Sequence, residues 1–266
     1  MADAPGSTLY VLAPHGTHSP LGQACVRALT DAVRLRRPDI EFVDAYVNVQ
    51  SPDPEEVVRG LRTRADVTDV TIVPVLLSTG YHVSVDLKRA ADLAVELAGA
   101  LGRPVSARVT RPLGPDPRLA AVLARRLGEA GLRPGDGRVV TIADAGSRGL
   151  AAQRDVTAMS ALLARQLGRS VTVSHGSAAE PLTADLVRHH GDLGRRVAVA
   201  TYLLAPGHFA TKLAASGADL VTLPLIPPAA ADDPSAVPDE LIDLVLDRAG
   251  LRGRMPLPCD AETLSA

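Results

Sequence analysis

The chain has 266 residues, of which 46% are hydrophobic and 22% are charged, so it is long enough for two modest domains with apolar cores. Its formal net charge of −2 provides no basic field, which argues against a nucleic-acid partner. No signal-peptide pattern or apolar run of the roughly 18 residues that span a bilayer is present. Cys25 and Cys259 form no CxxC pair, which argues against a disulfide scaffold or structural zinc. We therefore expect a cytoplasmic protein that does not bind membranes.

Short apolar runs rich in β-branched residues alternate with segments of helical spacing. The first part of the chain predicts strands at 9–13, 40–47, 70–77 and 105–109, with helices at 21–35, 55–64, 83–101 and 118–130. After a Gly- and Pro-rich break at 131–137, the pattern predicts strands at 139–143, 171–174, 197–203 and 220–223, with helices at 152–167, 182–189, 210–216 and 239–249. Apolar strands between helices are typical of parallel sheets covered on both faces. We therefore predict two similar doubly wound α/β domains, residues 1–132 and 133–266.

The two parts of the sequence resemble each other. Residues 13–18 (APHGTH) align with 143–148 (ADAGSR) at an offset of 130, and the match continues without a gap to Gln23 and Gln153. Residues 76–82 (LLSTGYH) align with 203–209 (LLAPGHF) at an offset of 127. Two ordered matches at nearly one offset indicate an internal duplication.

Two histidines stand out against this duplication. His15 directly follows the first predicted strand and His82 the third, and ligand sites of parallel sheets lie beyond the carboxyl ends of strands. The second copy has Ala145 and Phe209 at these positions. We therefore expect one histidine pair per chain, facing a cleft and handling a metal ion.

The turn at residues 13–22 (APHGTHSPLG) resembles the HGSxxPxG opening of the sirohydrochlorin chelatases, the class II tetrapyrrole chelatases. Residues 73–86 (VPVLLSTGYHVSVD) are similar to the second signature of that family, PxxLxxGxHxxxD. The second half resembles the degenerate C-terminal copy of the long, internally duplicated members. The resemblance extends roughly from Thr8 to Ala249.

This resemblance implies a chelatase that inserts Fe²⁺ or Co²⁺, with Ni²⁺ in some relatives, into sirohydrochlorin or a related macrocycle without ATP. It is a lyase of the sirohydrochlorin ferrochelatase or cobaltochelatase type, serving siroheme or cobalamin biosynthesis, with the metal as substrate and no organic cofactor. Carried over by position, His15 and His82 bind the metal and accept the pyrrole protons, and their individual roles stay open. The macrocycle would lie in an active-site cleft between the two domains.

The sequence departs from the family where relatives often carry a carboxylate at the end of the second strand. Asn48 occupies this position, and its amide cannot act as a base. Asp44 lies on the same face of the predicted strand but nearer its interior, so the identity of a third ligand stays open. Asp86, four residues after His82, is either an outer-shell partner of the site or a first-turn acid that interacts with the helix dipole.

Other residues near the predicted strand ends are candidates for contact with the macrocycle. A ring with many carboxylates needs cationic side chains around the cleft, and a flat conjugated ring suits aromatic neighbours. His208 is either a wall residue, which we favour, or an auxiliary proton carrier or ligand. We assign no role to His18, His175, His189 and His190. The predicted substrate-binding residues are Thr17, Ser78, Gly80, Tyr81, Arg148, His208 and Phe209.

One alternative to catalysis is a carrier that binds metal or tetrapyrrole in the same cleft, for which the loss of the strand-two acid is the supporting observation. Another is a different enzyme on the same scaffold, because a fold does not fix a function. Two fused halves already build a cleft, so we expect a monomer, with a dimer as the alternative.

Overall fold

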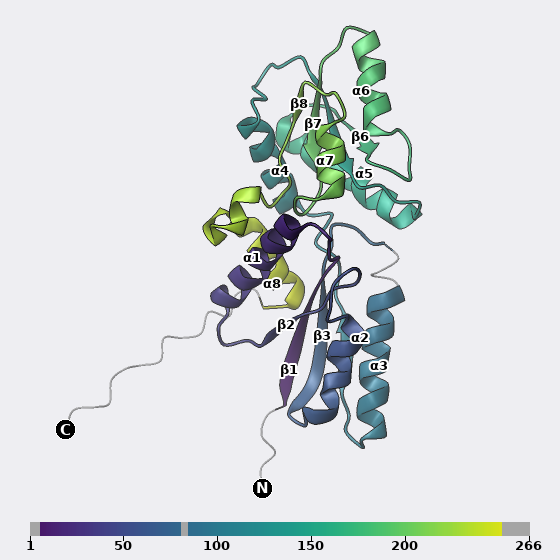
Figure 1. The fold of residues 1–266 in the computed structure, drawn as a ribbon, viewed down its shortest axis with the longest axis vertical. Helices are drawn as coiled ribbons and strands as arrows, with labels where there is room; N and C mark the ends of the chain where they lie inside the picture. The colour runs from purple at the N-terminus through teal and green to yellow at the C-terminus, as the bar shows by residue number, and fades with distance from the viewer. Residues whose placement is uncertain (1–5, 81–84, 252–266) are drawn as a thin grey trace, which may run out of the picture.

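The computed structural model describes residues 6–80 and 85–251, and Figure 1 shows two α/β halves, one above the other. In this part of the chain, eight strands form two parallel four-stranded sheets, ordered β2-β1-β3-β4 and β6-β5-β7-β8. The predicted fold class is therefore confirmed, and both sheets have the same topology. The strands are β1 (Ser7–Pro14), β2 (Phe42–Asp44), β3 (Val67–Val75), β4 (Ser106–Val109), β5 (Val139–Asp144), β6 (Val171–His175), β7 (Val197–Thr201) and β8 (Leu220–Val221).

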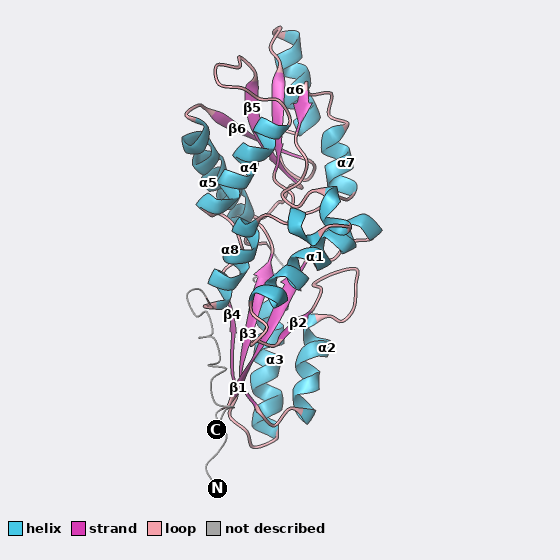
Figure 2. Cartoon of the chain, turned by 90° about the vertical axis from the view of Figure 1, so that its left-hand side faces the viewer, coloured by secondary structure: helices cyan, strands magenta, loops and turns pink. Residues whose placement is uncertain are grey.

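Helices cover the sheets in both halves (Figure 2). They are α1 (Pro20–Arg36), α2 (Pro54–Arg59), α3 (Leu87–Ala100), α4 (Pro117–Glu129), α5 (Leu150–Leu167), α6 (Thr183–Asp192), α7 (His208–Ala214) and α8 (Asp239–Ala249), with 3-10 turns η1 (Gly60–Thr63), η3 (Pro228–Ala231) and η4 (Pro234–Ala236). Their starts and stops follow local chemistry. The Ser19 hydroxyl caps α1 before Pro20, and Gly168 and Gly250 end α5 and α8 in the left-handed conformation. Among the helices of the described residues, none has the length and apolarity of a membrane span.

The alternating pattern predicted the order of elements better than their ends. The strand expected at 40–47 is only Phe42–Asp44, because the chain then enters a loop closed by a hydrogen bond from the Tyr46 N–H to the Pro52 carbonyl at 2.8 Å. The helix expected at 83–101 is observed as Leu87–Ala100, and residues 83–84 lie outside the described residues.

Two helices, α4 and α8, each pack on the half of the molecule opposite to the one in which the predicted boundary at 132/133 places them. Although α4 precedes the second sheet, it packs on α5 and β7, whereas α8 returns from the second half to contact α1, α4 and β3 (Figure 1). The boundary at 132/133 separates the two sheets but not the helices that cover them. The division into residues 1–132 and 133–266 therefore stays a prediction, and the crossing helices join the halves.

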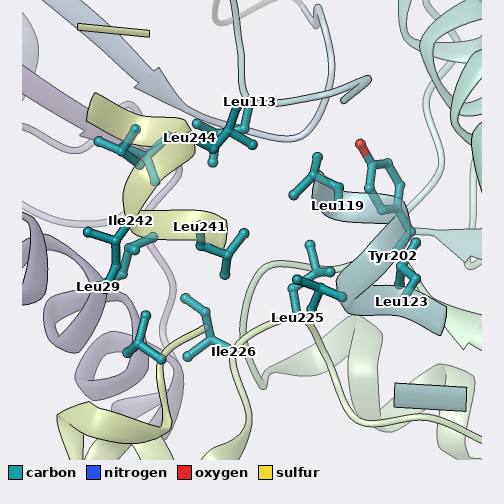
Figure 3. Packing of buried hydrophobic residues seen from close by; sticks show 14 of the residues in the cluster. Leu29, Leu113, Leu119, Leu123, Tyr202, Leu225, Ile226, Leu241, Ile242 and Leu244 are labelled. Carbon is teal, nitrogen blue, oxygen red and sulfur yellow. The ribbon is translucent and has the colours of Figure 1, made fainter. Parts of the chain in front are cut away.

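The largest apolar core is shared by the two halves. Figure 3 shows Leu29 of α1 beside Ile242 of α8, and Leu123 of α4 beside Tyr202, which follows β7. Burying each of these side chains contributes roughly 1.5–3 kcal/mol. Because one cluster includes residues from both sheets, the core fixes the two sheets relative to each other and so fixes any cleft between them.

Candidate active site

A cleft of about 650 Å³ lies between the halves, in the size range of small-molecule sites. Its walls come mainly from the turns that follow the two central strands of each sheet, β1 and β3 in the first half and β5 and β7 in the second. Val49 and Gln50 and residues of α1 and α5 complete the lining. Parallel strands place their carboxyl ends at one sheet edge, where ligands bind. Of the predicted site residues, the cleft is lined by His15, Thr17, Ser78, Gly80, His208 and Phe209.

His15 occupies the turn after β1. Its side chain is exposed, and its Nδ1 lies 3.0 Å from the Gly16 carbonyl oxygen. This contact favours the tautomer with a proton on Nδ1, which puts the lone pair on Nε2, the atom that can hold a metal or accept a proton.

The backbone of this turn requires glycine. Gly16 has a φ of +84°, and a Cβ there would lie 2.0 Å from the Asn48 carbonyl oxygen. The turn is fixed by two amide side chains: Gln50 Oε1 accepts from the Thr17 N–H at 2.9 Å, and Gln23 Nε2 donates to the Thr17 carbonyl at 2.7 Å. The Thr17 hydroxyl accepts from the Ser19 N–H at 3.1 Å, so Thr17 lines the cleft and also closes the turn.

Neither strand-two candidate for a third ligand is among the residues that line the cleft. Asp44 forms an ion pair with Arg34 at 2.8 Å and accepts from the Thr30 hydroxyl at 3.1 Å, so it faces α1. The Asn48 side chain accepts from the Val49 N–H at 3.0 Å within its own loop. The loop presents Gln50 to the cleft instead, a residue that our sequence analysis missed. Its position in the loop after a predicted strand was the available signal.

The turn after β3 is held by the second half of the chain. The Thr79 N–H donates to Asp155 Oδ2 of α5 at 2.6 Å, and the buried Tyr202 hydroxyl donates to the Leu77 carbonyl at 2.8 Å. Ser78 and Gly80 line the cleft. Tyr81 and His82 lie outside the described residues, so the predicted histidine pair stays a prediction.

The remaining predicted residues have different surroundings. His208 and Phe209 begin α7, and their ring centroids lie 5.2 Å apart in an edge-to-face arrangement inside the cleft. Arg148 is exposed beside Ser147, which lines the cleft, and Asp86 is the N-cap residue of α3. His18, to which we assigned no role, also lines the cleft.

The opposite wall carries a titratable pair that our sequence analysis missed. Asp144, the last residue of β5, lines the cleft, and its Oδ1 lies 2.6 Å from Nδ1 of His175 at the end of β6. Burial raises the pKa of the Asp144 carboxyl above its ordinary value, although the hydrogen bond from His175 acts in the opposite direction. An acid at the end of a predicted strand, directly before a Gly-containing turn, was a signal for Asp144 in the sequence.

Residues 9–130 match the model of the CbiX family. The sirohydrochlorin cobaltochelatases of Methanosarcina barkeri and Methanosarcina acetivorans are each 27% identical to this chain over 119 residues, which is 44% of this chain and 91% of theirs. The family match therefore concerns the half that carries His15.

Solved structures extend the similarity to both halves. SirB from Bacillus subtilis with Fe³⁺ has a TM-score of 0.71 at 18% identity, covering 92% of this chain and 94% of SirB. The cobalt complex of SirB from Bacillus subtilis subspecies spizizenii has a TM-score of 0.66 at 17% identity, covering 92% of this chain and 97% of the other. CbiX, described as the terminal enzyme of siroheme biosynthesis in denitrifying bacteria, has a TM-score of 0.56 at 20% identity, covering 88% and 97%. These similarities establish the fold of both halves. The CbiX family match thus covers the first half of the chain, and the fold shared with SirB and CbiX covers both halves.

Proposed function

We propose that this protein inserts Fe²⁺ or Co²⁺ into sirohydrochlorin or a related tetrapyrrole, without ATP, in the cleft between its halves. The observation that carries the proposal is the position of His15. It lines the cleft from the glycine turn at the carboxyl end of β1, within the segment that matches CbiX. The relatives matched by sequence are named cobaltochelatases, and SirB structures contain Fe³⁺ or cobalt. These names support the substrate class.

The cleft walls suit a flat macrocycle with polar edges. Val75, Leu77, Leu204 and Phe209 provide apolar surface for the ring faces. The Nε2 lone pair of His15 supplies a ligand or a base on one side, and imidazole suits divalent iron and cobalt. By family resemblance His82 is its partner, with Arg148 at the rim for a carboxylate of the ring. The cytoplasmic location and monomeric state stay predictions.

Metal insertion needs both a held cation and acceptors for two pyrrole protons. A neutral imidazole can do either, because its lone pair binds a metal or a proton. Two histidines could therefore share the work, one as ligand and one as base. A carrier of metal or tetrapyrrole remains the second candidate, favoured by Asn48 binding its own loop rather than offering a carboxylate.

Absorbance spectra distinguish the two functions. Protein at one-twentieth of the sirohydrochlorin concentration is mixed with Co²⁺, or with Fe²⁺ under anaerobic conditions, and metallation is followed against a protein-free blank. We expect accelerated conversion of all the macrocycle, whereas a change that stops after one equivalent would indicate a carrier.

Substitution of the histidines tests the site itself. His15→Ala and His82→Ala should each lower the rate at least about 100-fold, as expected for loss of a ligand or base. His189→Ala, on the exposed surface of α6, serves as the matched control and should keep the wild-type rate. Near-normal rates in both cleft variants would refute the proposed site.

A further inference from the structure

The Asp144–His175 pair lies in the cleft wall contributed by the second half. Asp144 and His175 are register partners at the ends of the neighbouring parallel strands β5 and β6. Register partners have side chains on the same face of a sheet, which brings the carboxylate and the imidazole within 2.6 Å. Asp144 lines the cleft, whereas His175 lies behind it, among the buried residues.

The Asp144–His175 pair is largely buried, although both side chains are polar. The side chains of Asp144 and His175 are only 14% and 6% exposed. Acidic side chains are rarely this buried unless they are partnered, because burial disfavours the ionised form. The same burial raises the pKa of the Asp144 carboxyl, so this carboxylate takes up a proton more readily than a surface aspartate would.

Several groups face the Asp144 carboxylate from the elements around it. His175 approaches from β6, and the Gly146 N–H donates from the following turn. The Tyr202 hydroxyl, after β7, is close enough for the charge of Asp144 to contribute to its raised pKa, for which burial is the main cause. Asp155 of α5 acts on Tyr202 in the same direction. Among these groups, Asp144 combines a carboxylate with a place in the cleft lining.

The first half has no such pair at the equivalent place. The Val47 N–H donates to the Pro14 carbonyl at 3.1 Å, and the Gly176 N–H donates to the Asp144 carbonyl at 2.8 Å, so Asp144 corresponds to Pro14 and His175 to Tyr46. At the next position the titratable residue is in the first half instead, because His15 corresponds to Ala145. Each half therefore contributes a different titratable group to one cleft.

We propose that Asp144 is a catalytic carboxylate that accepts one of the two pyrrole protons released when the metal enters the macrocycle, and that His175 is the positioning residue that holds it. This inference rests on the proposed function. Two N–H bonds break, their electron pairs remain on nitrogen and bind the divalent cation, and two protons leave without any change of oxidation state. Asp144 takes one proton, and the histidine that acts as base takes the other. The second half thus supplies a carboxylate, whereas position 48 of the first half, where relatives often have one, is an asparagine.

The direct test is Asp144→Asn, which keeps the size of the side chain and an acceptor for His175 but cannot serve as a carboxylate base. Metallation of sirohydrochlorin by Co²⁺ gives kcat, and titration with sirohydrochlorin in the absence of metal gives Kd. We expect kcat to fall about 100-fold, as for loss of a general base, while Kd changes less than about threefold. Asp185→Asn, which removes an exposed carboxylate from α6, should behave as wild type.

The role of His175 is tested by His175→Asn, whose side-chain amide can still donate to Asp144. We expect a smaller loss in kcat, of about tenfold, with Kd again preserved. A purely structural role would instead lower the melting temperature and leave the kcat of the folded protein unchanged.

Folding is checked by circular dichroism, with Asp144→Ser as the second variant if Asp144→Asn does not fold. Wild-type kcat, within threefold, in either folded variant overturns the inference while leaving the proposed function intact. Failure of both variants to fold identifies Asp144 as a structural residue and also overturns it. If the wild-type protein itself shows no multiple turnover, the proposed function fails, and this inference falls with it.

Discussion

The two halves share the geometry of their first strand-to-helix turn but differ in its chemistry. Gly16 and Gly146 have φ values of +84° and +94°, and each turn packs on the carbonyl of a facing loop, at Asn48 and Ser177. The amides of Gln23 and Gln153 donate to Thr17 and Ser147 at 2.7 and 2.9 Å. This matched backbone supports the internal duplication.

The side chains that line the cleft do not follow the same symmetry. The first half offers His15 where the second has Ala145, and the second offers Asp144 where the first has Pro14. Because the cleft lies between the halves, residues from both halves can act on one bound molecule. The difference teaches that the duplicated backbone acts as a scaffold and that chemistry can be divided between its copies.

The turn glycines provide the strongest test of this shared scaffold. A Cβ at Gly146 would lie 1.7 Å from the Ser177 carbonyl oxygen, and one at Gly16 would lie 2.0 Å from that of Asn48. Both contacts are with backbone, which cannot move aside as a flexible side chain would. Gly16→Ala and Gly146→Ala should therefore each lower the free energy of unfolding by at least about 3 kcal/mol, measured by urea denaturation.

Gly128→Ala in α4 is the matched control, because a Cβ there meets no atom within 4 Å. Gly128 lies in the last turn of α4, and alanine there should leave the free energy of unfolding unchanged or raise it by less than about 1 kcal/mol. If only one of the two turn variants were destabilised, the halves would not share the same constraint, and the symmetric scaffold would be refuted.

The sequence predicted the parts of this comparison that depend on local pattern. Strand periodicity located the turns that carry His15 and Ser78, and the repeat located their counterparts. The pairing of Asp144 with His175 depends on strand register across 31 residues, which no local pattern reports. The exchange of α4 and α8 between the sheets was likewise hidden, because an amphipathic helix shows which face it buries but not against which sheet.

The exchange of helices is secured by a charged cluster that can be broken selectively. Asp116 caps α4, accepts from Arg118 at 2.8 and 2.9 Å, and accepts from Arg248 of α8 at 3.1 Å. Asp116 and Arg248 are both buried. Asp116→Asn preserves the cap but removes the buried carboxylate that pairs with Arg118 and Arg248, which leaves them Asp247 as a shared partner. We expect a loss of about 2–3 kcal/mol in unfolding free energy at pH 7.

The same cluster has a defined pH dependence. Burial alone would raise the pKa of Asp116, but hydrogen bonds and charge from Arg118 and Arg248 outweigh it and hold this pKa below its ordinary value. A lowered pKa in the folded state stabilises the protein above the unfolded value of about 4 and loses that contribution as the pH falls through the folded value. Unfolding free energies between pH 7 and pH 3 should therefore fall more steeply for wild type than for Asp116→Asn.

The control for the substitution at pH 7 is Asp239→Asn, which removes the exposed partner of Arg36 and should cost less than about 1 kcal/mol in unfolding free energy. A cost equal to that of Asp116→Asn would refute the special role of Asp116.

A single hydroxyl tests the smallest link between the halves. Tyr202 is buried, and its hydroxyl donates to the Leu77 carbonyl at 2.8 Å. Gly114 packs closely on this hydroxyl, since a Cβ at Gly114 would lie 2.0 Å from it. Tyr202→Phe keeps the ring in the core and leaves the carbonyl without this donor, which should cost about 1–2 kcal/mol in urea denaturation. Tyr10→Phe, whose ring packs against Phe42, should change stability by less than about 0.5 kcal/mol. Equal effects would mean that the hydroxyl adds nothing to the ring, and the second half would then hold the β3 turn through Asp155 and apolar packing alone.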